Sequence, residues 1–325
     1  MANPIIAKVM RGAVVESRHR GSYVVVDAEG GISQSTGRID LPVFPRSAFK
    51  AFQCLPLLES GAAEKFSISD EEIALCCSSH SGEPEHVRVA RSILLKAGLD
   101  EDCYECGVHW PTAQNAAFKL VRDKIHAAQI HNNCSGKHAG MLVLAKHLGV
   151  HRTGYVNASH PVQQAIAAAI SKICNIDLKV APIAVDGCSV PTWAMPLFNM
   201  ALGFARLSNP NHIAGRRIIS AASSFPFLIA GTACFDTRLM GALPRVFVKM
   251  GAEGVYCGCI PHAGLGFALK CDDGAVRAAE VATAGLLMKL NVWTPYELVV
   301  LKSFVVEPNR NWRKVEVGDI HSTIY

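Results

Sequence analysis

Short runs of β-branched residues occur near both ends of the chain. Gly21–Asp27 contains three consecutive valines and precedes Glu29-Gly30-Gly31, a pattern typical of a strand that leads into a turn. We expect a partner strand within Ile5–Glu16. Further strands are predicted at Arg245–Lys249, Gly254–Ile260 and Gly266–Cys271, and strand character returns in Phe304–Val317.

The middle of the chain has the periodicity of helices. Met141, Leu144 and Leu148 recur at helical spacing, and Ser67–Ser69 before three acidic residues is typical of a capped helix start. Helices are predicted at Ala51–Ala63, His86–Ala97, Asn115–Gln129, Gly136–Leu148, Pro161–Cys174, Pro196–Arg206 and Glu280–Leu290. The predicted fold class is α+β, a single unit over 1–325. One antiparallel sheet is built from about 1–46 and 228–325, and a helical block, about 47–227, packs against it.

Composition narrows the functional classes. The chain has 325 residues, of which 50% are hydrophobic and 18% charged, so a sizeable core is expected. The net charge is +5, but no basic helix with interleaved aromatics occurs, and nucleic acid is not an expected partner. No apolar segment reaches 18 residues, which argues against a membrane span. Twelve cysteines without a signal-like N-terminal stretch predict a cytoplasmic protein with free thiols.

The first candidate for chemistry is Ser47-x-x-Lys50. Pro42 and Pro45 precede it, so a helix is expected to begin near Ser47, and the two side chains would share one face of its first turn. A lysine there can accept the serine proton if its pKa is lowered. The same spacing is the nucleophile signature of penicillin-binding proteins and serine β-lactamases. The alternative is an N-cap serine beside a solvated lysine.

Three further loops concentrate polar and thiol groups. Cys76–Pro84 could bring hydroxyls to a cleft or could be a capped helix end. His131–Met141 places a cysteine, a lysine and a histidine within five residues, and its alternative is a polar N-capping loop. Ala184–Trp193 follows an apolar run with Asp186-Gly187-Cys188. If Cys134 and Cys188 meet, two sulfurs with N or O donors would suit Zn²⁺; otherwise Cys188 is a buried thiol beside a turn.

The remaining cysteines do not form a recognisable metal motif. Cys103-x-x-Cys106 stands alone without a second pair, so free thiols are expected there. Cys257-x-Cys259 should point into the core from one strand face. Cys271 is interpreted as a small hydrophobe, and the histidines outside the loops described above as surface residues.

Four stretches together resemble a known family: Phe44–Lys50, Cys77–Pro84, Asn132–His138 and Val185–Pro191. In this order, and over most of the chain, they resemble the rhizobial-type, or class 3, L-asparaginases, also called the asparaginase II family. The resemblance implies a serine β-lactamase-like and penicillin-binding-protein-like fold and a homodimer. It also implies L-asparagine as the substrate, with L-aspartate and ammonia as products.

The resemblance also implies catalytic roles. Ser47 would be the nucleophile, Lys50 its base and Ser79 a second catalytic hydroxyl. Where relatives carry a lysine paired with the second serine, we expect His262, which lies in Ile260–Gly266 between two predicted strands. The alternative for His262 is a glycine-rich hairpin turn.

A metal site follows from the same resemblance. Cys134, Lys137 and Cys188 would bind Zn²⁺, with water as the fourth ligand. Asp186, His138 and Arg46 would lie beside the metal or the substrate.

The residues themselves are compatible with two other functional classes. One is a different acyl hydrolase on the same scaffold, either a glutaminase, which differs by one substrate methylene, or a β-lactamase or D-Ala-D-Ala enzyme, which the missing export signal disfavours. The other is a zinc or thiol sensor without catalysis, which would release no ammonia from any amino-acid amide.

Overall fold

The large sheet is organised around β2 (Val14–Asp27), a strand of 14 residues in the computed structural model, which describes residues 2–324. Its first part pairs antiparallel with β1 (Ile5–Arg11), and its second part pairs with β10 (Leu265–Cys271) and β3 (Ile32–Thr36). The three consecutive valines of β2, Val24 to Val26, are fully buried, as a β-branched run between two layers should be.

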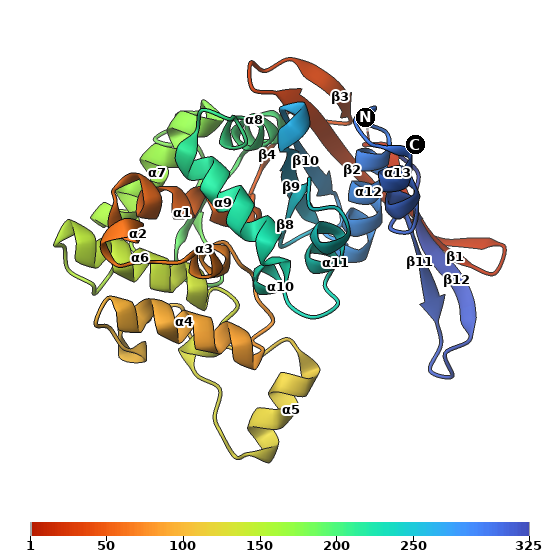
Figure 1. Cartoon of the computed structure of the whole chain (residues 1–325). Coiled ribbons are helices and arrows are strands. Elements are labelled where there is room, and N and C mark those ends of the chain that lie inside the picture. The colour runs from red at the N-terminus through yellow and green to blue at the C-terminus, as the bar shows by residue number, and fades with distance from the viewer. Residues whose placement is uncertain (1, 325) are drawn as a thin grey trace.

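Both ends of the chain contribute to this sheet (Figure 1). The strand order is β11-β12-β1-β2-β10-β9-β8, with β3 beside β2. The added strands are β8 (Phe247–Gly251), β9 (Val255–Ile260), β11 (Val306–Arg310) and β12 (Glu316–Ser322). Every pairing is antiparallel. The predicted α+β class, with one sheet built from both chain ends, is therefore confirmed.

Helices cover the sheet and form a separate block beside it (Figure 1). The block contains α1 (Lys50–Glu59), α2 (Ala62–Lys65), α3 (Asp70–Cys76), α4 (Pro84–Lys96), α5 (Gln114–Arg122), α6 (Ser135–Leu148), α7 (Pro161–Cys174), α8 (Leu197–Leu207), α9 (Ile213–Ser224) and α10 (Pro226–Ile229). Nearer the C-terminus are α11 (Phe235–Ala242), α12 (Val276–Met288) and α13 (Pro295–Lys302). None of the described helices is long and apolar enough to cross a membrane.

Helix α8 joins the block to the sheet at very close range. A Cβ atom on Gly266 of β10 would lie 2.1 Å from the carbonyl oxygen of Ala201 and 2.3 Å from the nitrogen of Ala205, both on α8. Glycine is therefore required there for steric reasons. Two short ribbons complete the molecule: β4 (Pro42–Val43) with β7 (Met195–Pro196), and β5 (Ile183–Val185) with β6 (Pro191–Trp193).

Several predicted elements match and others do not. Helix α7 has the predicted bounds, and Ser69 forms a capping box with Glu72 at the start of α3. The helix predicted to reach Gln129 ends at Arg122, where Asp123 and Lys124 turn the chain. Helices α9, α11 and α13 were not predicted. Glycine and polar residues interrupt the apolar pattern of α9 and α11, and α13 has only eight residues.

Candidate active site

Ser47 and Lys50 lie where a 3₁₀ turn, η1 (Arg46–Phe49), passes into α1. The predicted helix start is thus confirmed, but its first turn is tighter than an α-helix. The Ser47 side chain is half-buried, whereas Lys50 is fully buried. Within residues 2–324, the Ser47 hydroxyl makes no hydrogen bond to another group. The Ser47 hydroxyl is therefore partly accessible and, among the described residues, has no hydrogen-bond partner.

The Lys50 ammonium connects three of the motifs found in the sequence. It donates hydrogen bonds to the carbonyl oxygen of Ser78, to Ser79 Oγ at 2.9 Å and to the carbonyl oxygen of Asn133 at 3.3 Å. Burial of a lysine requires such partners, because an unpaired ammonium loses its hydration. Lys50 therefore holds the loop after α3 and the loop before α6 against the Ser47 turn.

A second buried lysine, Lys249 of β8, reaches Ser79 from the opposite side. Its Nζ donates to Ser79 Oγ at 3.1 Å and to the carbonyl oxygen of Met250 at 2.9 Å. Asp236 Oδ2, from α11, lies 3.8 Å away. Burial lowers the pKa of Lys249 to about 8, although the charge of Asp236 raises it and that of Lys50 lowers it further. Ser79 thus lies between two lysines.

His262 does not occupy the position expected for it. The residue is exposed on the 3₁₀ turn η4 (Pro261–Ala263) between β9 and β10. Its Nε2 faces the carbonyl oxygen of Val292 at 3.2 Å, and its ring lies against Trp293. The partner of Ser79 is Lys249, which is in register with Cys257 in the middle of β9, whereas His262 lies beyond the end of that strand. The prediction that His262 pairs with Ser79 is therefore wrong, and the hairpin-turn interpretation is correct.

One feature of the sequence points to Lys249. Phe247-Val248-Lys249-Met250 is an apolar strand with a single charge in it, and a lone lysine on a buried strand needs a buried counter-charge. The counter-charge, Asp236, comes from α11, a helix that the sequence pattern did not reveal.

Cys134, Lys137 and Cys188 meet in the structure. A Cβ atom on Gly136 would lie 2.3 Å from the carbonyl oxygen of Leu75, so glycine lets the start of α6 approach the end of α3. The Lys137 ammonium lies 3.0 Å from Cys188 Sγ. A hydrogen bond from Cys134 and the charge of Lys137 lower the pKa of Cys188 to about 4, while that hydrogen bond and burial raise the pKa of Cys134 to about 12.

These three side chains carry atoms that can act as zinc ligands. Two buried sulfurs and one amine face one another, and Cys188 already favours its thiolate form. Thiolates are common zinc ligands, and an amine can join them once it has lost its proton. The donor chemistry therefore fits the ion that the family resemblance implies.

Asp186 and Arg46 connect this cluster to the Ser47 turn. Arg46 Nε donates to Asp186 Oδ1 at 2.7 Å, and the Gly187 amide donates to the same oxygen. Burial raises the pKa of Asp186, but the charges of Lys137 and Arg46 lower it on balance. Arg46 has a φ of 52°, a left-handed conformation that is unfavourable for a residue with a Cβ.

His138 is buried on α6 immediately after Lys137. Its Nδ1 lies 2.7 Å from the Tyr155 hydroxyl, and burial lowers its pKa to about 3, so the ring is neutral. Within residues 2–324 its Nε2 is buried without a hydrogen-bond partner.

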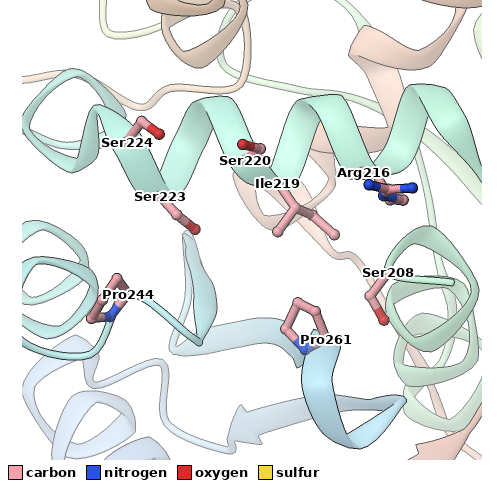
Figure 2. Close-up of a pocket in the computed structure, with 8 residues that line it drawn as sticks. All are labelled: Ser208, Arg216, Ile219, Ser220, Ser223, Ser224, Pro244 and Pro261. Atoms are coloured by element: carbon pink, nitrogen blue, oxygen red, sulfur yellow. The ribbon is translucent and has the colours of Figure 1, made fainter. Parts of the chain in front are cut away.

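Two other features lie apart from these residues. Cys103 and Cys106 have different partners, the Asp100 carboxylate and the carbonyl oxygen of Gln129. Figure 2 shows a pocket where α9 faces Pro244 and Pro261, and none of the candidate catalytic or metal-binding residues lines it.

The chain is similar to known proteins at two levels. A family model described as L-asparaginase II matches residues 7–322. Among solved structures, a β-lactamase from Mycobacterium bovis has 12% identity and a TM-score of 0.43, and the match covers 87% of this chain and 94% of that chain. A structure of Mglu has 13% identity and a TM-score of 0.36, with 80% of this chain and 64% of that chain covered. No curated protein matches the chain.

Proposed function

Because the chain belongs to the L-asparaginase II family, whose model spans residues 7–322, we propose that it hydrolyses the side-chain amide of L-asparagine through paired serine and lysine residues. Family membership itself supports an amidohydrolase activity on asparagine, a small-molecule substrate. The observation that carries the finer proposal is Ser79 Oγ, held 2.9 Å from Lys50 Nζ and 3.1 Å from Lys249 Nζ.

Ser47 is the proposed nucleophile. Its hydroxyl is partly exposed and, within residues 2–324, has no hydrogen-bond partner. Its own backbone N–H, at the start of the helix, would donate to the developing oxyanion. Lys50, one turn further on, is the proposed base: in the reactive form its Nζ is a neutral amine, which accepts the Ser47 proton. Hydrogen bonds of this kind commonly form only in the substrate complex, and the hydroxyl contacts no other group that would have to be displaced.

Ser79 is the proposed proton relay to the leaving group. Its hydroxyl contacts both lysines, so it can pass a proton from Lys50 to the departing ammonia and be reprotonated in turn. Lys249 remains charged and polarises the Ser79 oxygen, and Asp236 stabilises that charge. Water then hydrolyses the acyl-enzyme, with the serine oxygen of Ser47 as the leaving group.

A zinc ion is proposed at Cys134, Lys137 and Cys188. When bound, it would supply a Lewis acid that orders the α-amino or α-carboxylate end of the substrate. Arg46 and Asp186, which join this cluster to the Ser47 turn, would keep the two sites in a fixed relation. The homodimer and the cytoplasmic location remain predictions.

Ammonia release from L-asparagine and L-glutamine tests the proposal. Ser47→Ala and Ser79→Ala should both lose turnover by several orders of magnitude while melting like the parent. Ser223→Ala, which removes another half-buried hydroxyl on α9, is the matched control. Near-parental ammonia release from folded Ser47→Ala would refute the mechanism. Faster turnover of L-glutamine than of L-asparagine would make the protein a glutaminase instead.

A further inference from the structure

A second group of metal-binding side chains lies in the sheet, apart from the candidate active site. It consists of His19 from β2, Cys271 at the end of β10 and Asp273 in the turn before α12. One ligand atom from each residue lies within 4.8 Å of the others. Within residues 2–324 it is the one such group built from histidine, cysteine and carboxylate side chains. The sequence pattern does not reveal this group, because Cys271 resembles a small hydrophobic residue and His19 a surface residue.

The three side chains already face one another. His19 Nδ1 lies 2.7 Å from Asp273 Oδ2, and the Cys271 thiol lies 3.0 Å from Asp273 Oδ1. Ligand atoms in a tetrahedral zinc site with bonds of about 2.0–2.3 Å are about 3.5 Å apart. The two observed contacts are shorter than that value and involve different oxygens of Asp273, so the side chains would have to move apart by less than about 1 Å to admit an ion.

The backbone around the cluster is held in place before any ion binds. Cys271 pairs with Gly21 in the register between β10 and β2, which brings the end of β10 next to His19. Asp273 Oδ1 accepts a hydrogen bond from the Ala275 amide at the start of α12. The site is thus assembled from segments about 250 positions apart in the chain and is fixed by sheet pairing.

The burial of the three side chains resembles that of a metal centre in which two ligands are buried and one faces solvent. Cys271 is fully buried and His19 is 7% exposed, whereas the side chain of Asp273 is half exposed. Within residues 2–324, the buried Nε2 of His19 has no partner, so the hydrogen bonding of this ring is confined to the Nδ1 side that faces the cluster. Solvent can reach the carboxylate and supply a fourth ligand.

We propose that His19, Cys271 and Asp273 form a second site, for a zinc-type divalent cation, that fastens the middle of β2 to the end of β10 and the start of α12. On binding, Cys271 releases its proton to water, and the imidazole proton moves from Nδ1 to Nε2. Nitrogen, sulfur and carboxylate oxygen are each established zinc ligands, and three protein ligands with water complete a tetrahedron. The proposal is independent of the function proposed above, since no residue is shared.

Zinc content per folded chain, measured after dialysis against Zn²⁺ and desalting, tests this site. Cys271→Ala removes the thiol, and Cys257→Ala removes another fully buried thiol from the neighbouring strand β9 as the matched control. Cys271→Ala should hold one equivalent fewer than Cys257→Ala, whether or not Cys134 and Cys188 bind zinc. Equal zinc content in the two folded variants would overturn the proposal.

Cobalt provides a second readout if Cys271→Ala fails to fold. In a Cys134→Ala, Cys188→Ala background, Co²⁺ should still give a thiolate-to-cobalt absorption band, and His19→Gln in that background should abolish it. A protein that shows no such band before His19 is changed would contradict the proposal. This background also separates the two sites, because it lacks the sulfurs of the cluster beside the active site.

Discussion

The role assigned to Lys249 can be tested by removing its counter-charge. Asp236→Asn keeps the shape of the side chain and an oxygen that can accept the Met250 amide, which donates to Asp236 Oδ2 at 3.0 Å. It removes the negative charge 3.8 Å from Lys249 Nζ. Both residues are at most 2% exposed, so solvent screens the interaction weakly.

The size of the effect follows from Coulomb's law. Two unit charges about 4 Å apart attract by about 4 kcal/mol at an effective dielectric constant of about 20. Each pKa unit corresponds to about 1.4 kcal/mol, so the carboxylate raises the pKa of Lys249 by up to about 3 units. Losing an opposite charge disfavours the ammonium, so the pKa of Lys249, which burial lowers to about 8 in the parent, must fall further in Asp236→Asn.

Activity should follow the charged fraction of Lys249. In the parent, kcat/KM should decline on the alkaline side around pH 8, where the ammonium loses its proton. In Asp236→Asn that decline should begin one to three units lower, so activity at pH 7 falls by roughly 2- to 100-fold and recovers as the pH is lowered. The same measurement on Asp319→Asn, a carboxylate on β12 outside this network, should reproduce the parent profile.

Asp236 is one of several groups that act on the pKa of Lys249. Lys50 from α1 lowers its pKa, whereas Cys134 and Cys77 raise it, and none of these is altered by the substitution. A profile that superimposes on the parent would refute the role of Asp236. Higher activity of Asp236→Asn at pH 7 would show that the neutral amine is the working form of Lys249.

Four further predictions follow from the same contacts. Lys50→Met should abolish ammonia release, because the serines lose their shared base; substantial turnover in the folded variant would refute this. Chelation of zinc should raise KM more than it lowers kcat if the ion only orders the substrate, and a collapse of kcat alone would contradict that role. His262→Ala should leave the pH–rate profile unchanged, since the ring lies against Val292 and Trp293, away from Ser79; a shift of the alkaline decline in activity would contradict this. Ser69→Ala should reduce the free energy of unfolding by about 1 kcal/mol in denaturant titrations through loss of the α3 cap, and no change would show that the capping box contributes nothing.

Local signals account for most of what the sequence predicted correctly. Each of these signals spans only a few positions: the three consecutive valines of β2, the capping residues before α3 and the periodic apolar residues of α6. The predicted grouping of Cys134, Lys137 and Cys188 rested on a family resemblance, and the structure brings the three side chains together. Their binding of zinc stays a prediction.

The incorrect predictions share a different cause: the residue that decides the role of each side chain is distant from it in the sequence. Lys249 and Ser79 are 170 positions apart, and only the placement of β8 opposite the loop after α3 brings them together. His262 lies between two strands, near the position expected for the partner of Ser79, but turn residues point outward unless something packs over them. His19 and Cys271 were overlooked for the same reason, since strand pairing between β2 and β10 is not visible in either segment alone.

Backbone strain at the junction of the two candidate sites indicates how they are related. Arg46 is held at a φ of 52°, and Ser189, next to Cys188, is held at 76°. Such conformations cost of order 1–3 kcal/mol each and persist only where surrounding contacts enforce them. The 2.7 Å bond between Arg46 and Asp186 supplies such a contact, because it ties the residue before Ser47 to the loop that carries Cys188. The proposed zinc ion, by fixing Cys188, would therefore also fix the turn that carries Ser47, and this contact would couple the proposed nucleophile to the proposed metal site.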